Sequence, residues 1–221
     1  MRRLTAAAGI ATALLALAAC RSNPDVAAYV GDRQFTEAQV TQLLDDLKKQ
    51  QGAGADPSSL PNRTQVVQLL VLDQLCQRVN KAAAPAPAGP EDLGTISQRV
   101  QTCNESLQAA PVQPTEADLR EVYDNGVAVG AIVPADPEQS FEKLKDRLGA
   151  GGEVATALGK RKVLTDAAKA ADVSVNPRYR SLQFPLLSFQ QGPAISAILG
   201  QPASEAVVDR IAEPSPEALP Q

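Results

Sequence analysis

The chain of 221 residues contains no histidine and no tryptophan, and aromatic residues make up only 3% of it. Without histidine it cannot form Ser-His-Asp or Cys-His catalytic groups, imidazole metal sites or a histidine pH switch. Catalysis based on carboxylates or lysine is still compatible with this composition. The formal net charge of −4 argues against a basic nucleic-acid-binding protein. We therefore expect a non-enzymatic protein with no cofactor, no metal and no nucleic-acid partner.

The first residues have the pattern of an export signal. Arg2 and Arg3 precede an uncharged run from Leu4 to Ala18 that is rich in alanine and leucine. This run is shorter than the ~20 residues that span a bilayer, and small residues follow it. The pattern predicts a signal peptide over residues 1–19. The alternative is a short anchor helix that is never cleaved.

The signal ends in Leu17-Ala18-Ala19-Cys20, which resembles the lipobox of bacterial lipoproteins. That resemblance implies a diacylglyceryl group on the Cys20 sulfur, cleavage before Cys20 and acylation of the new amino group, for example with palmitate. Cleavage would leave 19 Lys and Arg against 25 Asp and Glu, a net charge of −6. An acidic chain is not attracted to anionic headgroups, so lipid would have to hold it at the extracytoplasmic face of the cell membrane. Residues 20–25 would form a short lipidated tether.

Hydrophobic periodicity predicts a mainly α-helical domain over residues 26–184. We expect five to six helices and a small two-stranded β element formed by the N- and C-terminal ends of the domain. The helices are expected after Thr36 and over residues 62–83, 91–109, 115–125, 137–148 and 153–171, and the strands over 26–30 and 172–175. Residues 82–90 form a Pro/Ala linker. Residues 185–221 contain six prolines and are expected to be a largely disordered tail.

Cys76 and Cys103 lie on the apolar seams of two helices that a short linker makes antiparallel neighbours. In an exported protein two such cysteines most simply form a disulfide. Closing a loop of this length would contribute about 3.6 kcal/mol in the chain-entropy estimate. Two buried thiols that act as small hydrophobes, or a redox-active pair, are the alternatives.

The sequence has more apolar residues than one helix seam can bury. The surplus residues are candidates for a peptide-binding surface. They are Val67, Leu70 and Val71 in the second helix, and Leu186, Leu187 and Phe189 beyond the closing strand. Tyr179 could belong to a binding edge or pack as a turn residue after the strand. The run from Lys160 to Lys162 could be a solvated face or a contact for anionic lipid. Glu116 and Asp118 fit the first turn of a helix better than a catalytic pair.

Three segments resemble the SurA and PrsA family of extracytoplasmic chaperones. They are VAAYVGDRQFTEAQV (26–40), PTEADLREVYDNG (114–126) and AADVSVNPRYRSLQF (170–184), in the order that the family has them. The resemblance implies that the first strand returns to pair with the last one and closes a single helical domain. It also implies ATP-independent binding of unfolded or partly folded exported polypeptides.

The chain departs from the family pattern in two places. Residues 126–149 occupy the position where many members carry a parvulin-type prolyl isomerase, which needs ~100 residues, and the histidines of parvulin sites are absent. Arg180 stands where the family has glycine. We therefore expect a membrane-anchored holdase-type chaperone. A structural or adaptor lipoprotein that docks one envelope partner, or a residual prolyl isomerase, are the alternatives.

Overall fold

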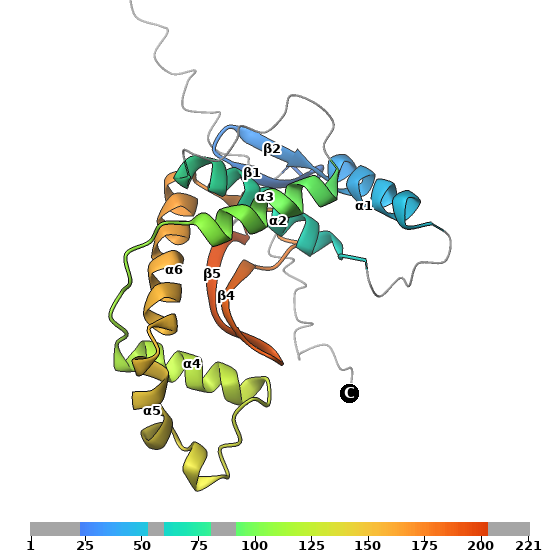
Figure 1. The fold of residues 1–221 in the computed structure, drawn as a ribbon. Coiled ribbons are helices and arrows are strands. Elements are labelled where there is room, and N and C mark those ends of the chain that lie inside the picture. The colour runs from blue at the N-terminus through green and yellow to red at the C-terminus, as the bar shows by residue number, and fades with distance from the viewer. Residues whose placement is uncertain (1–22, 53–59, 81–91, 203–221) are drawn as a thin grey trace, which may run out of the picture.

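The computed structural model describes residues 23–52, 60–80 and 92–202 (Figure 1). The predicted signal peptide, Cys20, the linker 82–90 and residues 203–221 of the predicted tail lie outside the described residues. The described elements, in chain order, are β1 (Val26–Val30), β2 (Arg33–Thr36), α1 (Glu37–Gln51), α2 (Arg63–Val79), α3 (Leu93–Ser106), α4 (Glu116–Ala128), the 3-10 helix η3 (Pro137–Gln139), α5 (Phe141–Ala150), α6 (Glu153–Ala170), β3 (Ser174–Val175), β4 (Leu182–Phe189) and β5 (Gly192–Pro202). The mainly α-helical fold with small β elements is confirmed.

The two ends of the predicted domain meet as expected. β1 pairs antiparallel with β3, with Ala28 opposite Val175 and Tyr29 opposite Ser174. The strand order is β2-β1-β3-β5-β4. β2 was not predicted, because it is four residues long and buries only Phe35. It folds back on β1 through a turn in which Gly31 has φ +63°, a conformation that favours glycine.

α2 is the central helix of the main core, as its broad apolar arc predicts. It contacts α1, α3, α6 and β1, so neighbours surround it on several sides. Cys76 of α2 and Cys103 of α3 form the predicted disulfide, and both residues are buried. The alternative of two free thiols does not describe this structure. The disulfide therefore joins the two antiparallel helices on either side of the linker.

The prediction of disorder from residue 185 onward is wrong for residues 185–202. These residues complete the hairpin of β4 and β5, in which Leu182 lies opposite Gly200 and Phe189 opposite Gly192. Alternate side chains face the core: Leu182, Ala197 and Leu199 are fully buried. The prolines are compatible with this arrangement because Pro185 lies in an edge strand, where a missing N–H is tolerated. The ordered domain thus extends from β1 to β5.

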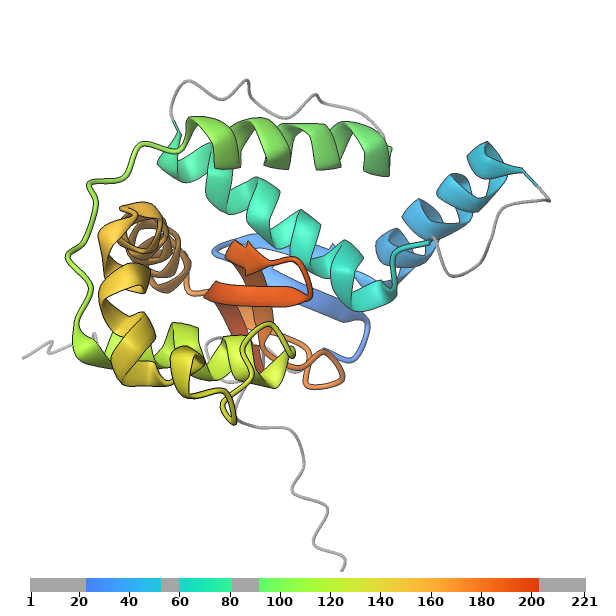
Figure 2. The ribbon, with the colours of Figure 1, turned by 60° about the horizontal axis from the view of Figure 1, so that its bottom comes forward.

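The hairpin determines how the remaining helices are arranged. In Figure 1, α6 stands beside the hairpin, α4 and α5 lie across one end, and α1, α2 and α3 lie at the other. Figure 2 shows the hairpin between α2 on one side and α4 on the other. α4 extends to Ala128, into the segment 126–137 for which we expected loop or extended structure. The next apolar cluster, around Val122, Leu158 and Ile195, joins α4, α6 and β5.

Candidate functional site

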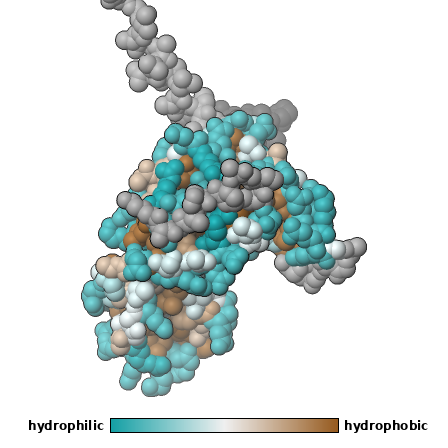
Figure 3. All heavy atoms as spheres, turned by 45° about the horizontal axis from the view of Figure 1, so that its top comes forward, coloured by the Kyte–Doolittle hydropathy of each residue, from teal (hydrophilic) through white to brown (hydrophobic). Residues whose placement is uncertain are grey.

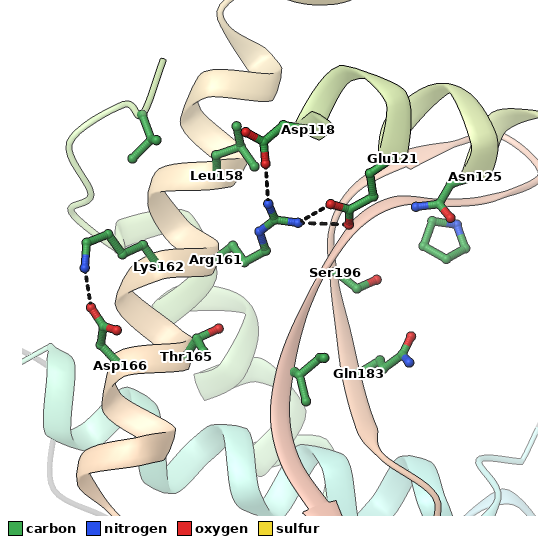
Figure 4. Close-up of a pocket in the computed structure, with 13 residues that line it drawn as sticks. Asp118, Glu121, Asn125, Leu158, Arg161, Lys162, Thr165, Asp166, Gln183 and Ser196 are labelled. Carbon is green, nitrogen blue, oxygen red and sulfur yellow. Dashed lines mark hydrogen bonds and ion pairs between the residues drawn. The ribbon is translucent and has the colours of Figure 1, made fainter. Parts of the chain in front are cut away.

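A groove of about 730 Å³ lies between α4, α6 and the β4–β5 hairpin (Figure 4). Its lining comprises Leu158, Arg161, Lys162, Thr165 and Asp166 of α6, Asp118, Glu121 and Asn125 of α4, Gln183, Pro193, Ser196 and Ile198 of the hairpin, and Val112. A second hollow of about 560 Å³ continues along α6 toward Asp172 and Gly200. Because Thr165 and Ile198 line both hollows, we treat them as one feature, the α6 groove.

The helical repeat of α6 separates a groove face from a core face. Residues 158, 161, 162, 165 and 166 follow the i, i+3, i+4, i+7, i+8 pattern of one helix side. Ala157 and Leu164 are buried on another side of the helix. The basic run from Lys160 to Lys162 is therefore divided. Lys160 donates to the Asn104 carbonyl at 2.5 Å, whereas Arg161 and Lys162 reach the groove.

Three contacts between segments that are distant in the sequence hold the other walls of the groove in place. The N–H of Val112 donates to the Ala155 carbonyl at 2.9 Å. Gly159 is packed so closely against the Ala110 carbonyl that a Cβ would collide with it. These contacts hold the segment before α4 against α6. On the opposite side, Asn125 Nδ2 donates to the Ala194 carbonyl at 2.9 Å and fixes α4 to β5.

An ion cluster occupies the α4 end of the groove. Arg161 Nη2 donates to Asp118 Oδ1 at 2.8 Å, and Nη1 donates to both carboxylate oxygens of Glu121 at 2.9 and 2.7 Å (Figure 4). Burial raises the pKa of Asp118, but the hydrogen bonds from Thr115 and the charge of Arg161 outweigh it and hold that pKa below its ordinary value. Asp118 is thus ionised at neutral pH. Lys162 pairs separately with Asp166 at 2.6 Å.

Exposed large hydrophobic residues are scarce in the described part of the chain, and two of the three line the same groove. Val112 is 37% exposed, Val133 52% and Ile198 44%. Val112 and Ile198 both line the α6 groove, whereas Val133 lies in the loop between α4 and η3. The face drawn in Figure 3 is mainly hydrophilic, with hydrophobic residues showing in small patches. The groove therefore combines accessible apolar groups with polar and charged groups.

The candidate binding residues on α2 are not on the surface. Val67 and Val71 are fully buried and Leu70 is 4% exposed, all within the main core. These side chains are buried because α2 contacts neighbours on several sides, so its core face is much wider than one seam. Leu186, Leu187 and Phe189 are half-buried. They line two smaller hollows away from the α6 groove, beside the N-terminal turn of α6.

Ile198 and Val112 were not identified from the sequence. Ile198 lies between the buried residues Ala197 and Leu199, which is the alternation of a strand with one exposed face. Interpreting residues 192–202 as a strand would have shown Ile198 to be outward-facing. Val112 had no comparable pattern, because its position depends on contacts with α6.

Tyr179 is a packing residue in this structure. It is 3% exposed, and its hydroxyl donates to Glu37 Oε2 at 2.8 Å. Arg63 Nη2 donates to the same oxygen at 2.6 Å. Burial raises the pKa of Tyr179, and the bond to Glu37 adds to that rise, so the phenol stays a neutral donor. The cluster joins the start of α1, the start of α2 and the segment after β3.

We expect Tyr179→Phe to lower the free energy of unfolding by about 1.5 kcal/mol, because a carboxylate in a partly buried site loses one donor. Urea denaturation measures this loss. Binding of an unfolded client should stay at the wild-type level, since Tyr179 does not line the α6 groove. Weaker client binding at unchanged stability would instead place Tyr179 in a binding edge.

Neither a protein-family model nor a curated protein nor a solved structure matches this chain. None of the described helices has the length and apolar character needed to cross a membrane. The described residues also include no group of three or more cysteine, aspartate or glutamate side chains that could hold a metal ion. The resemblance to the SurA and PrsA family stays a prediction from the three sequence segments.

Proposed function

We propose that the protein is an extracytoplasmic lipoprotein that binds unfolded or partly folded exported polypeptides without ATP and without catalysis. The observation that carries this proposal is the placement of two exposed aliphatic residues, Val112 and Ile198, in one open groove. Folded proteins leave few large apolar side chains exposed, and those gathered in a concavity commonly mark a binding surface. The binding surface is the α6 groove rather than α2.

The groove suits an extended segment of chain. Ile198, Val112 and Pro193 offer apolar contacts for client side chains. Gln183, Ser196 and Thr165 offer hydrogen-bonding groups that client backbone amides and carbonyls require when they leave water. Such contacts depend little on client sequence. Ordering a flexible client costs much of what they contribute, so we expect weak affinity.

Two features support action outside the cytoplasm. The Cys76–Cys103 disulfide is typical of proteins that fold in an oxidising compartment. The segment before Cys20 has the pattern of an export signal and a lipobox. A tether as short as residues 20–25 would keep the groove close to the membrane surface, where exported chains emerge.

We expect the mature chain to suppress aggregation of an unfolded client, and Ile198→Ser to remove most of that suppression. Light scattering of a diluted, denatured client at several molar ratios measures it. Val133→Ser is the matched control, because Val133 is equally aliphatic and more exposed but lies outside the groove. No suppression by the wild-type chain at several-fold excess would contradict the proposal. Capture of one stoichiometric folded partner would favour an adaptor lipoprotein instead.

A further inference from the structure

The α6 groove contains more acidic than basic side chains at its α4 end, and this imbalance affects which client segments it binds. Lys162 and Asp166 neutralise each other at 2.6 Å. Asp118 and Glu121, by contrast, share the single guanidinium of Arg161. The α4 end of the groove therefore carries one uncompensated negative charge. An acidic client residue would be repelled there, and a lysine or arginine would be attracted.

Glu121 is the carboxylate that a client can reach. Its side chain is 42% exposed, against 21% for Asp118. Both of its oxygens accept from the same nitrogen of Arg161, which leaves lone pairs on the solvent side for a second donor. Asp118 is more enclosed, because it also accepts from the N–H and the hydroxyl of Thr115. Glu121 thus provides the open end of the ion cluster.

The apolar contact lies further along the groove than this charge, where Thr165 and Ile198 line both hollows. Ile198 lines both parts of the groove together with Thr165, and its register partner Gln183 lies across the groove from Thr165 and Asp166 (Figure 4). Arg161, which holds Glu121, is four residues before Thr165. Four residues of helix rise about 6 Å. Side chains two positions apart on one face of an extended chain are about 6.6 Å apart.

We propose that the α6 groove selects extended segments in which a lysine or arginine lies two positions from a large aliphatic residue. This inference rests on the proposed function. The cation contacts Glu121, the aliphatic side chain packs on Ile198, and the intervening side chain points away from the floor of the groove. The partner is therefore a basic and apolar stretch of unfolded polypeptide, chosen by spacing and charge rather than by an exact sequence.

Four labelled peptides of equal length test the proposal against the mature full-length chain by fluorescence anisotropy. They carry Lys-x-Ile, Gln-x-Ile, Glu-x-Ile and adjacent Lys-Ile in an otherwise identical Gly/Ser background. We expect Lys-x-Ile to bind roughly threefold more tightly than Gln-x-Ile, as a half-exposed ion pair allows, and Glu-x-Ile to bind most weakly. Adjacent Lys-Ile should bind no better than Gln-x-Ile. Raising the salt to about 0.5 M should remove the preference but retain the binding of Gln-x-Ile.

Two variants connect this preference to the groove. Glu121→Gln should make the Lys and Gln peptides equivalent, whereas Glu116→Gln should leave the preference intact, because Glu116 makes the same charge change on α4 but does not line the groove. Ile198→Ser should weaken all four peptides. Equal binding of Lys-x-Ile and Gln-x-Ile by the wild-type chain would overturn this inference and leave the proposed function standing. Binding that is insensitive to Ile198→Ser would overturn the groove as the client site.

Discussion

Replacing both Cys76 and Cys103 with alanine is expected to lower the free energy of unfolding by about 3.6 kcal/mol. The disulfide closes a loop across a sequence separation of 27 residues, and opening it returns that loop's conformational freedom to the unfolded chain. For a domain of this size the loss corresponds to a melting temperature roughly 10 °C lower. Urea denaturation and thermal melting followed by circular dichroism measure the two quantities.

The reduced wild-type chain is the control for this prediction. A reductant should bring the wild-type chain close to the double variant, and it should leave the variant unchanged. Client binding by the folded fraction should persist, because α2 and α3 contribute nothing to the lining of the α6 groove. A double variant within about 1 kcal/mol of the oxidised wild-type chain would show that the native packing of α2 on α3 suffices without the covalent link.

Much of the helical framework was predictable from local sequence. Periodic apolar positions and capping residues at Asn62 and Thr115 mark helix faces and starts within a few residues, and both form complete capping boxes in the structure. The disulfide was also predictable, since both cysteines lie on the seams of neighbouring helices. These features depend on interactions within a helix or between two consecutive helices.

The β4–β5 hairpin was missed because its evidence is not local. Six prolines after Phe184 suggested disorder, yet proline is compatible with an edge strand. Strand propensity depends on the partner and on burial, and here the buried face of the hairpin is completed by α2, α4 and α6. No pattern within residues 182–202 indicates those three neighbours.

The candidate site was unpredictable for a related reason. Its walls come from residues 112–125, 158–173 and 183–200, so no single segment carries its pattern. Asp118 illustrates this. Its position in the first turn of a helix was correctly interpreted as a helix-start residue, but its partner Arg161 lies 43 residues further along the chain. The charge that distinguishes the α4 end of the groove appears only when α4 and α6 are packed together.

Asp73 provides the second large test, because it is a carboxylate buried in the central helix. It is 5% exposed and accepts from Arg99 Nε and Nη2, each at 2.9 Å, in a bidentate pair. Gln77 Nε2 donates to it at 2.9 Å as well. Asp73→Leu removes these acceptors but leaves the guanidinium of Arg99, whose side chain is only 19% exposed. We expect a loss of about 3 kcal/mol, because the largely buried Arg99 loses its bidentate carboxylate partner.

Replacing both partners should be far less costly than replacing one. In Asp73→Leu combined with Arg99→Met, both members of this ion pair are absent, and apolar side chains of similar size fill the space. We therefore expect the double variant to recover most of the stability that Asp73→Leu loses. Urea denaturation of the wild-type chain, Asp73→Leu, Arg99→Met and the double variant measures this recovery as a coupling energy. Asp46→Leu is the matched control, since its pair with Lys49 is exposed and should contribute little. If the double variant is as unstable as Asp73→Leu alone, the loss comes from removing the ion pair itself rather than from an arginine that has lost its carboxylate.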